Sequence, residues 1–323
     1  MSHPQYAVAL VAAIQRKLPV MVERAYTVGR SMIDRYPCQR PEQADGVEHT
    51  TMQTSGTAST YTPGAGFPAP DLGSQATGER DFGNYACTFT MTLKDMQKAA
   101  LAGKYGVDRF VNIQLELIDG KISALLDAIN TDIMTGNNVL AIDGLATRAI
   151  QDAAGFNIYQ GINRTVNPNH ACVVFDNAGV PRNVSSVLLT NSINTYKANL
   201  QKQVLSGWEG WTSAAMFSRL VQLDVGAHVN VAAEGVKYLG ANAVVVDGIP
   251  IYPVAGWPAN RIDFIDPNKP KRVGLEMGLY GQEWIAEVDK TAGSDVITVV
   301  IYSHQQLKLP NPRKNAFSIR DLV

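Results

Sequence analysis

His170 and Cys172 come closest in this sequence to the residue types and spacing of a metal site. On an extended strand, residues separated by one position point to the same side, so an imidazole and a thiolate would face one site together. The nearby sequence supplies no third ligand, and the other histidines are scattered without helical ligand spacing: His3, His49, His228 and His304. A pair of side chains on a half-buried strand is the simpler interpretation.

Two candidate acid/base pairs of carboxylates lie in one long helical pattern: Glu116 with Asp119, and Asp127 with Asp132. Their simpler interpretation is the solvated face of that helix. The P-loop, GxGxxG, GxSxG and HExxH patterns do not occur. We therefore predict no catalytic, cofactor-binding or metal-binding residue and no cofactor. An enzyme stays open as an alternative, because catalytic residues need not be close in sequence.

The composition points to a protein whose surface is covered by partners. Of the 323 residues, 46% are hydrophobic and only 18% are charged, and 28 basic residues balance 29 acidic ones. Soluble domains usually carry about 25% charged residues. The near-neutral balance also argues against a dedicated nucleic-acid-binding protein, which would show a basic stripe.

The three cysteines and the hydropathy pattern suggest neither disulfides nor a membrane span. Cys38, Cys87 and Cys172 are odd in number and lack CxxC spacing, which is typical of reduced thiols in a cytosolic protein. No window of about 18 apolar residues is present, so we expect no transmembrane helix and no membrane partner.

One long helix is predicted over Asp108–Thr135. Its apolar residues recur at intervals of three and four: Val111, Leu115, Ile118, Ile122, Leu125, Ile129 and Ile133. At 1.5 Å per residue the helix would be roughly 40 Å long. We expect a bend or close packing at Gly120, and a C-terminal stop at Gly136 and Asn137.

A long two-stranded ribbon is predicted before this helix. Residues Tyr85–Leu93 alternate as a half-exposed strand does, the segment from Val47 is β-prone, and the middle, Ser55–Gly83, is rich in Thr, Ser, Gly and Pro. Two strands around such a tip make a hairpin. Because an isolated ribbon is marginal in water, it needs another surface, most plausibly another subunit. A disordered loop of a monomer is the alternative.

Later segments predict a further helix followed by several strands. Asn183 or Ser185 can cap a helix with the apolar stripe Leu189, Ile193, Tyr196, Leu200 and Val204, and a shorter helix is expected from about Ser213 to Leu223. Asp247-Gly248 favours a type I′ hairpin whose second strand contains Pro250 and Pro253, which would place that strand at a sheet edge. Other expected strands are Ala171–Phe175, Arg261–Ile265, Val273–Tyr280, Trp284–Val288 and Val296–Tyr302. The predicted class is α+β.

Four stretches carry a resemblance to the Hong Kong 97-type major capsid proteins of tailed phages. They are AINTDIMTGNN at the end of the long helix, GWEGWTSAAMFSRLVQL, the pair VVVDGIPIYP and WPANRIDFID, and the ending VITVVIYSHQQLKLPNPRKNAFSIRDL. The order of elements is similar over nearly the whole chain.

The resemblance implies a Hong Kong 97-like capsid fold with five parts. These are an N-terminal arm (1–38), an extended β-ribbon loop (39–93), a peripheral domain (94–205) with a spine helix (108–135), an axial domain (206–295), and a return strand and tail of the peripheral domain (296–323). The implied function is a major capsid protein that self-assembles as hexamers and pentamers into an icosahedral shell around phage double-stranded DNA, without sequence-specific binding.

The resemblance also implies partners and a location. A portal would join the shell, and a decoration protein is a further candidate partner. The shell would assemble in the host cytoplasm and become part of the virion. No lysine lies between Lys17 and Lys94, so we expect a shell without covalent crosslinks through the ribbon. Because only a short stretch precedes the ribbon, we expect a separate scaffolding protein, or a chain that is already processed. The alternatives are an encapsulin-like nanocompartment shell protein and a soluble enzyme with a long lid loop.

Overall fold

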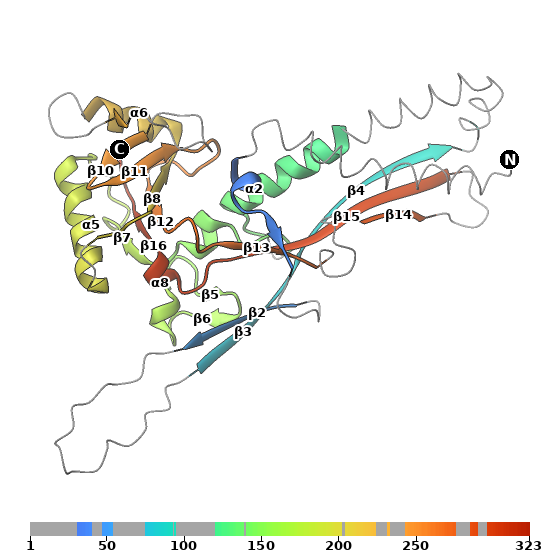
Figure 1. Cartoon of the computed structure of the whole chain (residues 1–323), viewed down its shortest axis with the longest axis horizontal. Helices are drawn as coiled ribbons and strands as arrows, with labels where there is room; N and C mark the ends of the chain where they lie inside the picture. The colour runs from blue at the N-terminus through green and yellow to red at the C-terminus, as the bar shows by residue number, and fades with distance from the viewer. Residues whose placement is uncertain are drawn as a thin grey trace, which may run out of the picture. The chain divides into compact units, whose positions relative to one another are not determined.

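A computed structural model describes residues 31–40, 47–53, 75–92, 94, 120–138, 140–201, 204–223, 231–232, 243–275, 285–289 and 296–323 (Figure 1). These residues belong to two compact units. Unit 1 draws on Met1–Gly46, Phe82–Ile142 and Lys271–Leu307, and unit 2 on Val47–Asp81, Asp143–Pro270 and Lys308–Val323.

Unit 1 is built on a five-stranded sheet around one long strand, β15. Strand β15 pairs with β4 in antiparallel register from Val296↔Thr92 to Gln305↔Gly83, and on its other side with β14 (Figure 1). The elements of this unit are α2 (Ser31–Arg35), β1 (Cys38–Gln39), β4 (Gly83–Thr92), β13 (Lys271–Gly274), β14 (Ile285–Asp289) and β15 (Val296–Lys308).

The alternating pattern predicted for Tyr85–Leu93 is confirmed as strand β4. Tyr85 and Phe89 are buried, whereas Ala86, Thr88 and Thr90, at the alternate positions of the strand, are exposed. The strand therefore has one face toward the core and one face toward solvent, as its period of two requires.

The described part of the long helix, residues 120–135, confirms the predicted buried stripe. Ile122, Leu125, Ile129 and Ile133 are all buried, and residues 108–119 lie outside the described residues. The helix ends before Gly136, whose N–H donates to the Asp132 carbonyl at 2.8 Å. A Cβ at position 120 would meet no described atom within 4 Å, so close packing at Gly120 is not found among the described residues. The alternative, a bend at Gly120, stays a prediction, because the residues before it lie outside the described ones.

Helix α2 packs against this long helix. Met32 and Ile33 are buried, and the Met32 N–H donates to Asn130 Oδ1 at 3.1 Å. The predicted N-terminal arm therefore has its last turn in the core of unit 1, and its first 30 residues lie outside the described residues.

The ribbon is present, but its second strand differs from the prediction. Strand β2 (Val47–Gln53) pairs antiparallel with β3 (Gln75–Asp81), from Val47↔Asp81 to Gln53↔Gln75. The predicted partner, Tyr85–Leu93, instead pairs with β15. The β3 sequence, QATGERD, lacks an apolar alternation, whereas β4 carries an apolar face that gains more from joining the larger sheet.

Unit 2 contains a seven-stranded sheet in the order β7-β16-β12-β8-β11-β10-β9. Asp247 and Gly248, with φ values of 51° and 79°, form the predicted tight turn between β10 and β11. The strands are β7 (Val173–Phe175), β8 (Glu209–Thr212), β9 (Val231–Ala232), β10 (Ala243–Val246), β11 (Ile249–Pro253), β12 (Ile262–Ile265) and β16 (Ala316–Ile319).

The expectation that Pro250 and Pro253 confine β11 to a sheet edge was wrong. Strand β11 pairs with β10 on one side and with β8 on the other. Backbone N–H groups alternate between the two sides of a strand. At Pro250 the missing N–H would face β8, and the pairing with β8 begins only at the next residue, Ile251↔Gly210. At Pro253 it would face β10, and the pairing with β10 ends before this residue, at Val244↔Ile251. Neither proline removes a hydrogen bond that the sheet uses.

Two helices cover one face of this sheet. Helix α5 (Ser186–Leu200) and helix α6 (Ala214–Leu223) share one hydrophobic core with β10, β11, β12 and β16. The Ser185 hydroxyl accepts from the Leu188 N–H at 3.2 Å, which confirms the cap. The stripe is shorter than predicted, because the helix ends at Leu200 and Val204 beyond it is 69% exposed.

The opposite face of the seven-stranded sheet carries polar residues and a segment that consists of several short helical turns and strands. Along β12, Ile262 and Phe264 belong to the helix-covered core, so Asp263 between them points to the other side. The short elements of unit 2 are the π-helical turn η1 (Leu145–Ala149), β5 (Ile158–Tyr159), β6 (Ile162–Asn163), the 3₁₀ turn η2 (Pro168–His170) and α8 (Pro312–Asn315).

A test of the buried helix stripe compares Leu125→Asp with Ala124→Asp. Leu125 is buried and Ala124 is exposed, so the first change puts an unpaired carboxylate in the core of unit 1 and should lower the free energy of unfolding by several kcal/mol. The second should change it by less than about 1 kcal/mol. Urea denaturation measures both; equal midpoints would contradict the assigned face.

Candidate functional site

His170 and Cys172 do not share a strand, contrary to the sequence-based interpretation. His170 ends the turn η2, while Cys172 precedes β7 and its thiol donates to the Ala316 carbonyl at 3.1 Å. The His170 ring instead stacks on Tyr159, with the ring centroids 5.5 Å apart. No three His, Cys, Asp or Glu side chains among the described residues are grouped to hold a metal ion.

The carboxylates of the long helix have separate environments. Asp127 is exposed, as predicted, whereas Asp132 is half-buried and accepts a hydrogen bond from the Tyr85 hydroxyl at 2.8 Å. Burial raises the pKa of Asp132, and the Tyr85 hydrogen bond opposes this shift. Asp132 thus joins the helix to β4, which corrects its assignment to the solvated face. Glu116 and Asp119 lie outside the described residues.

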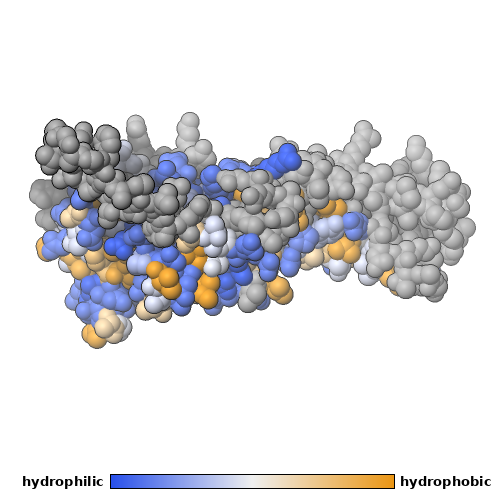
Figure 2. Space-filling model, turned by 90° about the horizontal axis from the view of Figure 1, so that it is seen from below, coloured by the Kyte–Doolittle hydropathy of each residue, from blue (hydrophilic) through white to orange (hydrophobic). Residues whose placement is uncertain are grey.

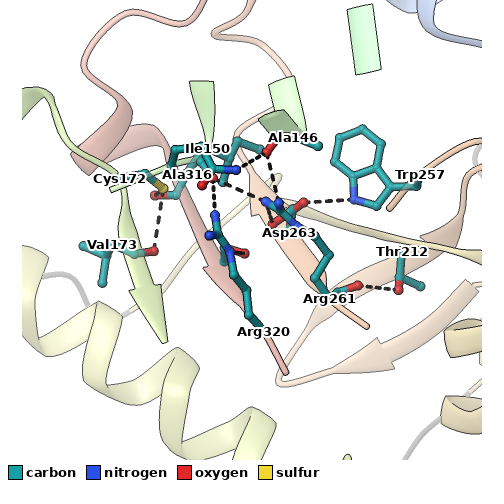
Figure 3. A network of polar contacts seen from close by, with 12 residues as sticks. Ala146, Ile150, Cys172, Val173, Thr212, Trp257, Arg261, Asp263, Ala316 and Arg320 are labelled. Atoms are coloured by element: carbon teal, nitrogen blue, oxygen red, sulfur yellow. Dashed lines mark hydrogen bonds and ion pairs between the residues drawn. The ribbon is translucent and has the colours of Figure 1, made fainter. Parts of the chain in front are cut away.

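A buried ion pair lies on the polar face of the unit 2 sheet (Figure 3). Arg261 Nη2 lies 2.6 Å from Asp263 Oδ1, and the second oxygen of Asp263 accepts from the Trp257 indole at 2.9 Å. The same guanidinium donates to the carbonyls of Ala146 at 3.0 Å and Ile150 at 3.3 Å. The pair therefore attaches the segment that begins with η1 to the sheet.

Two further arginines hold the same segment. Arg320, at the end of β16, donates to the Ile150 carbonyl at 2.8 Å (Figure 3). Arg164 is fully buried and donates to four backbone carbonyls, at 2.8 to 3.1 Å: Arg148, Ala149, Phe156 and His170. Its guanidinium also lies over the Tyr159 ring, 4.7 Å from the centroid. Carbonyl dipoles thus replace the water that the buried cation has lost.

This arrangement supports structure and offers no constellation for catalysis. Arg261 and Arg320 contact backbone carbonyls, Asp263 contacts Arg261 and the Trp257 indole, and no nucleophile with an adjacent base occurs in the network that Figure 3 draws. The sequence analysis missed the network. Its available signal was Asp263 between apolar residues in the strand Ile262–Ile265, where a solvated aspartate is not expected.

Hydrophobic side chains reach the surface among hydrophilic ones on the face of the molecule that Figure 2 shows. Several large aliphatic residues are more than half exposed: Leu140, Ile158, Val166, Val180, Val187 and Val204. In the part of the chain covered by the structure, no helix has the length and apolarity needed to cross a membrane.

Comparison with known proteins gives matches in structure alone. No protein-family model and no curated protein matches the sequence. The cyanophage A-1(L) capsid asymmetric unit matches with a TM-score of 0.63 at 14% identity, over 91% of this chain and 93% of that chain. The capsid of a native GTA particle matches with a TM-score of 0.60 at 9% identity, over 91% of both chains.

The chain has the Hong Kong 97-type capsid fold. The predicted α+β capsid fold is therefore confirmed. The holo-SrpI encapsulin complex from Synechococcus elongatus PCC 7942 also matches, with a TM-score of 0.52 at 7% identity, over 91% of this chain and 87% of that chain.

A test of the buried ion pair compares Asp263→Asn with Asp247→Asn. Asp263 is fully buried, so its neutralisation leaves Arg261 without a counter-charge and should cost about 3–5 kcal/mol of stability. Asp247 pairs with Lys197 near the surface, where the loss should be at most about 1 kcal/mol. Denaturant unfolding followed by tryptophan fluorescence distinguishes them; similar losses would show that the buried pair is not a stabilising contact.

A second test concerns the loss of folding stability at low pH to which His170 contributes. Burial and then the nearby Arg164 cation lower the pKa of His170 from 6.5 to about 4. The unfolded chain binds a proton below pH 6.5 and the folded chain does not until about pH 4, so stability is lost as the pH falls through this window. The loss from this group should be about 3 kcal/mol between pH 7 and pH 4.

His170→Phe keeps an aromatic ring against Tyr159 and removes the titrating group. Its free energy of unfolding should therefore fall less than that of the wild type between pH 7 and pH 4, by about the same 3 kcal/mol. Urea titrations at both pH values measure the difference. Parallel pH profiles for the two proteins would rule out this role for His170.

Proposed function

We propose that this protein is a major capsid protein of a tailed phage. Many copies, arranged as hexamers and pentamers, form an icosahedral shell that encloses double-stranded DNA. The observation that carries the proposal is the fold: the cyanophage A-1(L) capsid asymmetric unit and the GTA capsid each align with 91% of this chain. The alignments also cover 93% and 91% of those two capsid chains, as expected when one whole shell subunit is compared with another.

We assign the peripheral and axial parts of the capsid fold to the two units. Unit 1, with the spine helix and the long strands β4 and β15, is the proposed peripheral domain. The core of unit 2, in which α5 packs together with β10–β12, is the proposed axial domain. In this assignment the axial core begins well before residue 206, because α5 and β7 belong to it. The β2–β3 ribbon is the proposed extended loop.

The composition supports a subunit whose surface is covered in an assembly. Charged residues make up only 18% of the chain, the net charge is −1, and aliphatic side chains such as Val166 and Val187 are more than half exposed. Contacts between copies would bury such residues. The low net charge fits packaged DNA that is confined by the shell without sequence-specific binding.

The proposed setting is the virion, after assembly in the host cytoplasm. A separate scaffolding protein and a portal are the expected partners, and a decoration protein is a further candidate. Because the chain has no lysine from Leu18 to Leu93, the proposed shell is held together without covalent crosslinks through the ribbon.

An encapsulin-like nanocompartment is the second candidate, since an encapsulin shares the fold. Its TM-score of 0.52 is lower than the 0.63 of the cyanophage capsid, which favours the phage shell. An enzyme with a lid loop is disfavoured for two reasons. The segment 47–93, which would form the lid, contains the paired strands β2 and β3 and also β4, which pairs with β15. The polar network of Figure 3 contains no catalytic constellation. Nuclease-protected double-stranded DNA in particles isolated from producing cells would distinguish a phage shell from an enzyme-filled compartment.

Electron microscopy of the purified full-length protein tests the proposal directly. Shells, tubes or capsomers are expected. A small monomer under all assembly conditions would overturn it.

A deletion tests the role of the ribbon tip. Because Gln53 and Gln75 are directly paired, an Asn-Gly turn can replace residues 54–74 and keep both strands. The variant should retain the wild-type circular dichroism spectrum and melting temperature but fail to form stable shells. Wild-type yields of shells from the variant would show that the tip makes no essential contact between subunits.

A further inference from the structure

The base of the β2–β3 ribbon crosses the β5–β6 turn at two glycines. A Cβ at Gly78, in β3, would lie 2.2 Å from the Gln160 carbonyl oxygen. A Cβ at Gly161, in the turn, would lie 2.5 Å from both the N and the O of Glu79. Such distances are too short for any side chain, so the two backbones touch directly. The crossing requires glycine at both positions.

One buried carboxylate joins the same two elements to a third. Asp143 is 1% exposed and its Oδ1 lies 3.1 Å from Arg80 Nη2 of the ribbon and 2.7 Å from Arg148 Nη1 of η1. Its Oδ2 accepts from Gln160 Nε2 of the β5–β6 turn at 2.9 Å. We call Arg80, Asp143, Arg148 and Gln160 the Asp143 cluster. Because a buried carboxylate requires all its partners, the cluster resists a change in the position of any one element.

The glycine crossing and the Asp143 cluster hold the ribbon at neighbouring points. Gly78 and Arg80 are two residues apart in β3, and Gln160 and Gly161 are adjacent in the turn. The glycine crossing is a steric contact between two backbones, whereas the Asp143 cluster is held by directional hydrogen bonds and ion pairs. Two different contacts on one short stretch restrict both the distance and the angle between the ribbon and the elements of unit 2 that carry it.

We propose that this double contact sets the direction of the ribbon, and thereby the size of the shell. The proposal rests on the proposed capsid function. Thr50, the partner of Gly78, lies three residues or about 10 Å from the end of β2 at Gln53, so a rotation of about 10° at the crossing moves that end by about 2 Å. If the ribbon lies on a neighbouring subunit, that displacement changes the angle between subunits. Arg80, Gly78 and Gly161 are then positioning residues for assembly.

The test uses three variants of the full-length chain with two matched controls. Gly78→Ala and Gly161→Ala disturb the crossing, and Arg80→Met removes the charge on the ribbon. Gly179→Ala is the control for Gly161→Ala, because it has a similar φ of +77° and a Cβ there would meet nothing within 4 Å. Lys197→Met is the control for Arg80→Met, because it removes an ion pair of unit 2 away from the ribbon.

Two measurements separate the contact from its consequence. Hydrogen exchange of the unassembled subunit reports on β2 and β3, and electron microscopy reports the diameters of assembled particles. We expect amides of β2 and β3 to exchange about tenfold faster in the three variants than in the wild type. The melting temperature of the subunit should be nearly unchanged, because the seven-stranded sheet keeps its contacts. Their particles should be heterogeneous or shifted in diameter, and both controls should match the wild type.

Each outcome has a distinct meaning. Unchanged exchange in Gly78→Ala and Arg80→Met would overturn the proposed contact, whatever the particles look like. Faster exchange with particles of wild-type diameter would overturn the link to shell size. Wild-type protein that forms no particles, with exchange that responds as expected, would refute the capsid function and leave the ribbon contact standing. If Gly161→Ala does not fold, Arg80→Met still decides the question.

Discussion

Burial of the Arg164 and Arg261 guanidinium groups constrains the rest of unit 2. A buried cation costs several kcal/mol unless its lost hydration is replaced. Arg164 obtains that replacement from four carbonyls, and Arg261 from a carboxylate and two carbonyls. Such carbonyls are supplied most readily by a backbone that does not use them in regular helices or strands. This requirement accounts for the short, irregular elements between Asp143 and His170: a π-helical turn, two two-residue strands and a 3₁₀ turn.

The predictable parts of the fold are those in which one-dimensional periodicity determines burial. Ile122, Leu125, Ile129 and Ile133 define the inner face of the helix by spacing alone, and the Asp247-Gly248 turn follows from the φ values that such residues tolerate. Strand β3 escaped prediction because its residues are polar and its partner lies more than twenty residues away across the tip. The rule that prolines favour sheet edges failed at β11 because it ignores on which side of the strand the missing N–H would lie.

The buried polar network could not be predicted for a different reason. Arg164, Asp143 and Arg261 are scattered along the chain, and a charged residue in sequence carries no sign of whether it is solvated or partnered. Asp263 gave a local hint from its apolar neighbours, but its partner Trp257 lies outside the strand. His170 and Cys172 show the reverse case: their spacing suggested a shared site, and a turn between them places their side chains in different surroundings.

The pairing of β4 with β15 has a consequence for biosynthesis. Thr92 and Val296 are partners separated by about two hundred residues, and β16, near the end of the chain, lies between β7 and β12 in the interior of the other sheet. The two sheets can be completed only after β15 and β16, respectively, have emerged from the ribosome. Contacts between such distant residues form slowly. For the shell subunit proposed above, this order of events would separate the folding of each copy from its encounter with others.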